Sequence, residues 1–295
     1  MRNIILGTDW SSDCDDAIAV RLLCRAHKEG RINLLGVNID DNIPESVRSL
    51  SAFLTSEGCG DVPIGFDRSA KYVCKNPRYQ KRLCLLPSSY LTNEQAEPSV
   101  PFFRKLISRA KGEVEILEIG YTQSLAALLK SKPDAFSPLS GYDLVEKKVK
   151  KLWIMAGKWN EQGGKEHNFC GTRATKKGGA FLCKNWNTPV TFLGWEVAAG
   201  VFFGGNLSEG DVLRDVLIDY GCDPDVGRDG WDPMLVQLAL IGDENEAGYT
   251  VVKGKAKLSP ITGKNTFSVG SGNHCYVVKR MPDEYYVSQI NELIK

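Results

Sequence analysis

Four aspartates stand close together near the start of the chain, at positions 9, 13, 15 and 16. Carboxylates this close repel one another, and a bound proton, solvent or a divalent cation relieves the repulsion. Because all-oxygen ligands suit hard cations, the favoured ion is Ca²⁺ or Mg²⁺ rather than zinc. The alternative is that one or two of these aspartates cap a helix while the others form a solvated turn.

The residues on either side of the acidic stretch predict the elements that position it. The apolar run at 4–6 predicts a buried strand, and the apolar spacing from 17 to 23 predicts a helix. A second strand is predicted at 32–39, and the polar residues 40–42 follow it. In an open α/β sheet, ligands bind at the carboxyl ends of strands. The aspartates are therefore expected at a ligand site.

The rest of the sequence continues this alternation, apart from residues 66–100, which are interpreted as a surface excursion or a lid. Further strands are predicted at 62–65, 114–119, 152–155 and 190–193, and a β-rich part at 249–276. Further helices are predicted at 45–55, 102–110, 122–130, 174–183, 211–219, 233–241 and 283–294. We therefore expect one α/β domain over 1–295. Its open, mostly parallel sheet is flanked by helices, with a Rossmann-like core and a small β-rich C-terminal part.

The composition excludes several classes of partner. The formal net charge of the 295 residues is +1, which gives no electrostatic reason to expect nucleic acid or a membrane surface. No apolar run approaches the ~20 residues of a membrane span. The nine cysteines are odd in number and include no C-x-x-C pair, and the start of the chain shows no signal-peptide pattern. These features indicate free thiols and a cytoplasmic protein.

Polar clusters also follow other predicted strands. They include residues 40–42, 120–124 and 160–168, and the aspartates 229 and 232 precede a late apolar helix. Loop polarity and helix capping explain any one of these clusters. Because the carboxyl ends of parallel strands lie on one side of a sheet, however, all of them are expected to converge.

The acidic stretch resembles the signature of the inosine-uridine-preferring nucleoside hydrolase family. That signature is a strand followed by D-T-D-P-G-x-D-D-A, and the sequence here reads GTDWSSDCDDA. Thr8, Asp9 and the run Asp15-Asp16-Ala17 match it. The linker between the two matching parts is two residues longer, and Gly7 stands where the family has its first aspartate.

Three further segments resemble this family and occur in the same order. Its E-F-N segment reads Glu166-His167-Asn168 here, and Asn160 stands at the family's spacing before it. Its H-D-P segment reads Trp231-Asp232-Pro233, at the head of an apolar helix. Its G-P-L-T-N-L-A segment reads GYTQSLA at 120–126. Each motif alone is weak, but their combination at predicted strand ends is specific.

The resemblance implies a Ca²⁺ ion at the floor of the site, bound to water and to two ribose hydroxyls. Its ligands would be Asp9, Asp16, Asp232 and the backbone carbonyl of Gln123, which stands where the family has threonine. The large and flexible oxygen coordination of Ca²⁺ suits a diol. The resemblance therefore makes the acidic stretch the core of a calcium site.

The resemblance also assigns catalytic and substrate-binding roles. Asp9 would take a proton from the attacking water, and Asn42 would lie near that water, with Asp41 as the alternative. The substrate contacts would be Asp15 with the 2′-hydroxyl, Asn168 with the 3′-hydroxyl, Asn160 and Glu166 with the 5′-hydroxyl, and Trp231 with the base. Carboxylates around the ribose would stabilise the positive charge that grows as an N-glycosidic bond breaks.

Trp231 departs from the family, whose histidine at this position protonates a purine leaving group. Tryptophan stacks on a base but does not donate a proton in this way. His167 is a candidate substitute acid, with Asp229 and Tyr249 as weaker candidates. Asp13 lies in the lengthened linker and inherits no role. It is expected to lie in a solvated turn or to join the metal ligands.

The leading hypothesis is a Ca²⁺-dependent N-ribohydrolase in nucleoside salvage. It would cleave a ribonucleoside or related N-riboside to base plus ribose, as a homodimer or homotetramer. The alternative from another class is a ribose- or nucleoside-binding protein of the same fold without hydrolase activity, motivated by Trp231 and Gly7. A third hypothesis is a haloacid-dehalogenase-type phosphatase, since Asp13 and Asp15 have its separation, although the strand does not lead directly into them.

Overall fold

A computed structural model describes residues 1–71 and 78–295, and strands and helices alternate along most of the chain. The strands are β1 (Arg2–Thr8), β2 (Ile32–Ile39), β3 (Ile64–Phe66), β4 (Glu97–Pro98), β5 (Val114–Glu118), β6 (Val149–Met155), β7 (Val190–Leu193), β8 (Phe202–Gly204), β9 (Gly227–Asp229), β10 (Tyr249–Leu258), β11 (Asn265–Val269) and β12 (His274–Lys279). The helices are α1 (Asp15–Lys28), α2 (Ser46–Ser56), α3 (Gln80–Leu83), the 3₁₀ turn η1 (Asn93–Gln95), α4 (Ser99–Arg109), α5 (Gln123–Lys130), α6 (Gly141–Lys148), α7 (His167–Cys170), α8 (Arg173–Asn185), α9 (Trp195–Ala198), α10 (Val212–Tyr220), α11 (Trp231–Ile241) and α12 (Asp283–Ile294).

The main sheet has ten strands in the order β11-β10-β12-β7-β6-β5-β1-β2-β3-β4. From β12 across to β4, neighbouring strands pair in parallel. The β10 strand pairs antiparallel with β11 and β12 and so forms the β-rich C-terminal part. A separate antiparallel pair joins β8 to β9. The predicted open, mostly parallel sheet is therefore confirmed.

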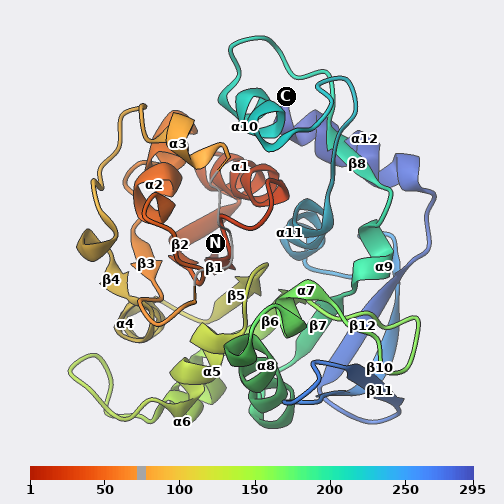
Figure 1. Ribbon diagram of the computed structural model, residues 1–295. Helices are drawn as coiled ribbons and strands as arrows, with labels where there is room; N and C mark the ends of the chain where they lie inside the picture. Colours follow the sequence, from red (N-terminus) through yellow and green to blue (C-terminus); the bar gives the residue numbers. More distant parts are fainter. Residues whose placement is uncertain (72–77) are drawn as a thin grey trace.

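Two hydrophobic cores lie on opposite faces of this sheet. In β1, Ile4 and Leu6 pack in one core and Ile5 packs in the other, as the alternation of side chains along a strand requires. The first core contains residues of α1, α2, α11 and α12, and the second contains residues of α4, α5, α6 and α8. Figure 1 shows α1, α2 and α11 on one side of the sheet and α5, α6 and α8 on the other.

The position of β1 between β5 and β2 decides where a ligand can bind. The chain passes from β1 to β2 on one side, and β5 later joins β1 on the other side. Loops after β1 and β5 therefore diverge in opposite directions, and the crevice between them is the usual ligand site of a doubly wound sheet. The acidic stretch follows β1, so the topology places it at this crevice.

Most predicted elements agree closely with the structure, and the bounds of β2, β7 and α12 match the prediction fully. The sequence analysis missed α6 and the short elements α7, α9, β8 and β9. The short elements span only three or four residues, and segments of this length carry little periodic signal. The excursion at 66–100 returns to the sheet as β4, beside β3. Its residues 72–77 lie outside the described part of the chain.

Among the described helices, none combines the length and the apolar character needed to cross a membrane.

Candidate active site

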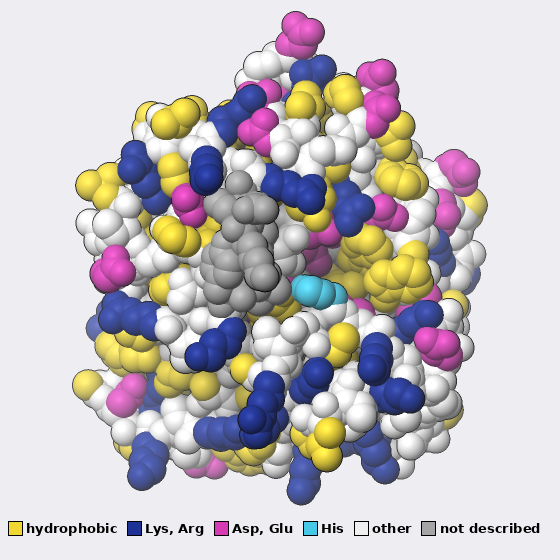
Figure 2. Space-filling model, in the orientation of Figure 1, with side chains coloured by type: hydrophobic (Ala, Val, Ile, Leu, Met, Phe, Trp, Pro, Cys, Tyr) yellow, Lys and Arg dark blue, Asp and Glu magenta, His cyan; other side chains and the backbone are white. Residues whose placement is uncertain are grey.

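A cavity of about 250 Å³ opens at the carboxyl ends of the central strands. Its walls come from the ends of β1, β5, β6 and β7 and from the N-terminal ends of α1 and α11. The lining residues are Asp9, Ser12, Asp13, Asp15, Asp16, Ile119, Met155, Glu166, His167, Asn168, Trp195, Arg228, Trp231 and Asp232. Figure 2 shows acidic side chains recessed in a hollow of this face, with an exposed hydrophobic patch beside them.

Four buried carboxyl groups form the floor of the cavity: Asp9, Asp15, Asp16 and Asp232, called the floor aspartates below. Asp15 and Asp16 are the first residues of α1, and Asp232 lies in the first turn of α11. The partial positive charge of a helix N-terminus favours carboxylates at such positions. The α1 and α11 helices pack side by side, so residues more than two hundred positions apart share one site.

Oxygen atoms of Asp15, Asp16 and Asp232 lie within 4.8 Å of one another. Burial and the charges of neighbouring carboxylates raise the pKa of each floor aspartate well above its usual value. Asp9 Oδ2 and Asp16 Oδ2 are buried and have no hydrogen-bond partner among the described residues. A divalent cation with oxygen ligands would satisfy these atoms and offset the repulsion, so the donor set fits a hard metal ion.

Hydrogen bonds fix the orientation of the floor aspartates. The hydroxyl of Thr8, the last residue of β1, donates to Asp16 Oδ1. The backbone N–H of Asp232 donates to Asp15 Oδ2 at 3.1 Å and so couples the start of α11 to the start of α1. The rigid elements on both sides therefore hold the carboxyl groups close together despite their repulsion.

Glu166 and Asn168 form a second polar wall of the cavity. The carboxylate of Glu166 caps α7 and accepts from the backbone N–H groups of Asn168 at 2.5 Å and Gly157 at 2.9 Å. Burial raises the pKa of Glu166 to about 7. The amide nitrogen of Asn168 donates to the carbonyls of Ile119 and Met155 at 2.9 and 3.0 Å. This leaves the amide oxygen of Asn168 to accept from a ligand hydroxyl.

Three residues that the sequence analysis placed in the site, Asn42, Gln123 and Asn160, do not line the cavity. Asn42 is half-buried, and Asn160 is exposed in the loop after β6. The side-chain amide of Gln123 donates to the Asp40 carbonyl at 2.6 Å. Their assigned roles stay predictions.

Of the alternative residues considered, Asp41 is fully buried beside Asp9 and accepts from the Ser11 N–H at 3.1 Å. Burial raises the pKa of Asp41 to about 7. Asp229 accepts from the Gly200 N–H at 2.6 Å, and Tyr249 packs on Tyr286 in the core. Neither Asp229 nor Tyr249 lines the cavity.

Gly7 stands where the family has an aspartate, and the structure gives the reason for this departure. A Cβ atom at Gly7 would lie 2.4 Å from Glu118 Oε2, so the fully buried carboxyl group of Glu118 fills this space. Glu118 and Asp40 are neighbouring buried carboxyl groups. Burial raises the pKa of Glu118 to about 7. A carboxyl group therefore lies beside this glycine, but it comes from β5 rather than from β1.

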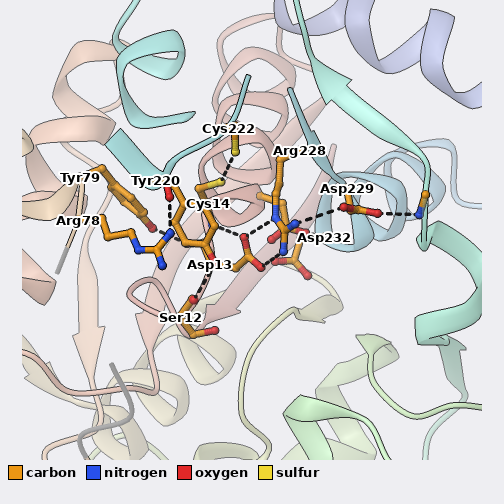
Figure 3. Close-up of polar contacts among 12 residues, drawn as sticks. Ser12, Asp13, Cys14, Arg78, Tyr79, Tyr220, Cys222, Arg228, Asp229 and Asp232 are labelled. Carbon is orange, nitrogen blue, oxygen red and sulfur yellow. Dashed lines mark hydrogen bonds and ion pairs between the residues drawn. The ribbon is translucent and has the colours of Figure 1, made fainter. Parts of the chain in front are cut away.

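Arg228 and Trp195 line the cavity and were missed by the sequence analysis. Trp195 lies two residues after the end of β7, so the strand-end rule used for the other clusters predicts such a position. Arg228 lies on the three-residue strand β9. The only feature of the sequence that points to Arg228 as a site residue is its position three residues before Trp231. Figure 3 shows Arg228 between Asp13 and Asp229, with dashed contacts to both.

Asp13 is paired with Arg228 rather than free in a solvated turn, and about a quarter of its side chain stays exposed. Both of its carboxylate oxygens accept from Arg228. The Tyr79 hydroxyl donates to the Asp13 carbonyl at 2.7 Å, and the neighbouring thiol of Cys14 lies 3.7 Å from that of Cys222 (Figure 3). The longer linker is therefore held against β9 and the loop after α10.

His167 and Trp231 are the two residues on which a leaving-group acid depends. His167 keeps part of its surface exposed, and its Nε2 lies 2.8 Å from the Tyr121 hydroxyl. Partial burial of the ring lowers the pKa of His167. The indole N–H of Trp231 donates to the Trp195 carbonyl at 2.8 Å. Both side chains reach the same cavity as the floor aspartates.

No family model and no curated protein matches the sequence. Solved structures do match. A purine-preferring ribonucleoside hydrolase from Gardnerella vaginalis has a TM-score of 0.73 at 17% identity, over 100% of this chain and 99% of that one. An inosine-uridine preferring nucleoside hydrolase from Bacillus anthracis has a TM-score of 0.69 at 14% identity, over 100% and 99%.

A third match is the type III effector protein XopQ, solved in complex with adenosine diphosphate ribose. It has a TM-score of 0.70 at 14% identity and covers 99% of this chain and 92% of that one. The matches extend over nearly the full length of each chain. This chain therefore has the nucleoside-hydrolase fold, as the resemblance of its four motifs implied.

Proposed function

We propose that this protein is a metal-dependent N-ribohydrolase that cleaves a ribonucleoside or related N-riboside to base plus ribose. The observation that carries this proposal is the meeting of the floor aspartates with Glu166 and Asn168 in one cavity. These residues come from three motifs that are distant in the sequence. Their resemblance to nucleoside hydrolases and the fold shared with such enzymes support the same activity.

The metal of this proposal is Ca²⁺, held by Asp9, Asp16 and Asp232, with the backbone carbonyl of Gln123 as a further ligand. The all-oxygen donor set supports a hard cation, as do the buried oxygens of Asp9 and Asp16 that have no partner within residues 1–71 and 78–295. When bound, such an ion lowers the pKa of water and binds diol oxygens.

In this proposal, each side chain of the cavity has a separate role toward the substrate. Asp9 accepts the proton of the attacking water, with Asn42 or Asp41 beside it. Asp15 accepts from the 2′-hydroxyl, and the free amide oxygen of Asn168 accepts from the 3′-hydroxyl. Glu166, together with Asn160, holds the 5′-hydroxyl, and Trp231 contacts the base.

The reaction consists of a displacement at the anomeric carbon of the ribose. Water attacks C1′, the bond between C1′ and the base nitrogen breaks, and the electron pair of that bond stays with the base. Positive charge develops on the ribose before the new bond is complete. The buried carboxylates of the floor stabilise this charge more strongly than solvent would, because they are fixed and poorly hydrated.

A reducing-sugar assay over a panel of N-ribosides with Ca²⁺ tests this function. Asp9→Asn should reduce kcat at least about 100-fold, the usual minimum for a lost general base. Asp61→Asn is the control, since Asp61 is exposed and lies outside the cavity. Absence of divalent-ion binding at millimolar concentration, measured by calorimetry, would exclude the proposal.

The second candidate function is binding of a riboside without hydrolysis. It is favoured by Trp231, which provides no transferable proton, and by the structural likeness to a protein crystallised with adenosine diphosphate ribose. A thermal-shift screen separates the two functions. Stabilisation by ribose or nucleosides without release of base over hours would favour binding alone.

The assembly and location expected from the sequence belong to the same proposal. A homodimer or homotetramer is expected, and light scattering on the purified protein measures its mass. A cytoplasmic location is supported by the free cysteines among the described residues.

A further inference from the structure

The side of the cavity that faces the base differs in chemistry from the side that faces the ribose. This inference rests on the proposed function, which assigns the floor aspartates, Glu166 and Asn168 to the ribose and the metal. The other lining residues are Ser12, Ile119, Met155 and five with an aromatic ring or a charge, which are Asp13, His167, Trp195, Arg228 and Trp231. These five comprise two indole rings, one histidine and the two members of one ion pair.

Trp195 and Trp231 form an aromatic platform. Their rings lie nearly parallel, with centroids 6.5 Å apart and planes inclined by 22°. Trp195 remains 42% exposed, so one part of this platform is free for a ligand. The indole N–H of Trp231 is already donated to the Trp195 carbonyl at 2.8 Å. The platform therefore offers stacking area to a base but no proton.

The charges of the cavity favour a cation over an anion. Its described lining contains the carboxyl groups of the floor aspartates, Asp13 and Glu166, against the single guanidinium of Arg228. Arg228 is bound through two nitrogens to Asp13 and through a third to Asp229 at 3.2 Å. Its charge is thus compensated within the protein. A phosphate or other anion near the base would meet mainly carboxylates.

The aromatic faces also attract positive charge. Lys158 Nζ lies 5.1 Å from the centroid of the Trp195 ring, and the guanidinium carbon of Arg228 lies 5.4 Å from the Trp231 ring. Both cations are paired with carboxylates, Lys158 with Glu161 at 3.0 Å. Indole rings bind cations more strongly than other aromatic side chains. A flat cationic ring therefore suits the platform in both shape and charge.

We propose that the substrate is an N-riboside whose base already carries a positive charge, such as a pyridinium or an N7-alkylated purinium. When the C1′–N bond of such a compound breaks, its electron pair neutralises the ring, and the base leaves without a proton. Water supplies the hydroxyl group at C1′, and its remaining proton passes to Asp9 and then to solvent. For this substrate class, neither the platform nor His167 needs to donate a proton to the base.

Matched pairs of ribosides test the proposal with the full-length protein and Ca²⁺. Nicotinamide riboside is compared with uridine and inosine, and 7-methylguanosine with guanosine at a slightly acidic pH where it is cationic. We expect kcat/KM for the cationic member to exceed that of the neutral member at least about 100-fold, the contribution of a missing general acid. Neutral ribosides cleaved within about tenfold of the cationic ones would overturn this inference and leave the proposed function intact. If no riboside is cleaved, the proposed function itself fails.

Variants separate recognition by the platform from the intrinsic lability of cationic ribosides. Trp195→Leu should raise KM for nicotinamide riboside about fivefold and change that for uridine much less, because only the cation loses a cation–π contact. Tyr142→Leu is the matched control, since Tyr142 is a 41% exposed aromatic residue outside the cavity. Equal effects of Trp195→Leu on both substrates would contradict the proposal.

A second variant tests the proton balance directly. Trp231→His installs a donor and should raise inosine cleavage by more than about tenfold without improving nicotinamide riboside. If Trp231→His improves both substrates equally, or neither, the missing proton donor does not set the substrate class. Circular dichroism of each variant establishes that it is folded before the kinetics are compared.

Discussion

Asp13 and Arg228 form a bidentate ion pair in the cavity wall, although 215 positions separate them in the sequence. Nε of Arg228 lies 2.9 Å from Oδ1 of Asp13, and Nη2 lies 2.7 Å from Oδ2. Asp13 belongs to the linker that is longer than in the resembling family, and Arg228 belongs to β9. The pair therefore fixes the lengthened linker against a separate part of the fold and neutralises one carboxylate beside the floor aspartates.

A double-mutant cycle measures the strength of this pair. For Asp13→Asn, Arg228→Gln and the double variant, we expect a coupling free energy of about 1 to 2 kcal/mol in urea unfolding. The pair has good geometry, but about a quarter of each side chain is exposed, so solvent weakens it. The pair Arg31–Glu29, in which both side chains are well exposed, is the control, with an expected coupling of about 0.5 kcal/mol or less. Equal coupling in the two cycles would show that Arg228 does not anchor the linker.

The buried repulsion among the floor aspartates predicts opposite effects of Asp232→Asn with and without metal. In EDTA the variant should be as stable as the wild type or more so, since one of several mutually repelling carboxyl groups is removed. With Ca²⁺ the wild type should gain Tm and the variant should not, because binding to the native state stabilises it. Thermal denaturation with and without metal measures both effects, and Asp61→Asn should behave as the wild type. A full calcium response in Asp232→Asn would remove this residue from the ligand set.

Arg21 joins three elements through buried ion pairs, and its loss should be costly. It contacts Glu57 at 2.7 Å after α2, Asp211 at 2.6 Å before α10, and the carbonyl of Ile294 at the end of α12. Arg21→Ala leaves both carboxylates without their partner and should lower the free energy of unfolding by about 3 to 5 kcal/mol.

Arg31→Ala is the matched control for Arg21→Ala. Arg31 pairs with Glu29 on the surface, and both side chains are well exposed, so the loss should stay within about 1 kcal/mol. Chemical denaturation of the two variants makes the comparison. A loss below 1 kcal/mol for Arg21→Ala would mean that this network adds nothing to stability.

Glu118 should make the protein less stable as the pH rises through neutrality. Burial raises its folded-state pKa to about 7, above the usual value of 4.5, so the protonated form is favoured in the folded state. The stabilisation is therefore complete below pH 4.5 and is lost as the pH rises through about 7. The loss in the free energy of unfolding is up to about 3 kcal/mol.

Glu118→Gln replaces this carboxyl group with a neutral group of the same shape. In EDTA, its stability should fall less steeply than that of the wild type between pH 4.5 and 8, a range that spans the usual pKa and the raised value of about 7. Glu113→Gln, on the exposed segment before β5, should keep the wild-type slope. Parallel curves for Glu118→Gln and the wild type would contradict a protonated Glu118 beside Gly7.

The repeated alternation of apolar strands and amphipathic helices was enough to predict the parallel sheet. In elements such as β2, α11 and α12, the pattern of apolar residues reflects which side chains are buried. The predicted bounds of these elements therefore agree with the structure to within two residues. The pair β8–β9 and the helix α9 escaped prediction because three or four residues carry no periodic signal. Their positions depend instead on the long-range packing of α10, α11 and α12 around them.

For the candidate site, the sequence by itself determined the acidic motif after β1, the Glu166–Asn168 segment and Asp232, since residue type and spacing carry these patterns locally. Only the tertiary structure decided which of them share a cavity. It brought Asp15, Asp16 and Asp232 together through the packing of α1 on α11, and it left Asn42, Gln123 and Asn160 outside the lining. It also paired Asp13 with Arg228 and placed Glu118 beside Gly7. Contacts between elements that are distant in the sequence determine these pairs. The local spacing of residues along the chain therefore does not predict them.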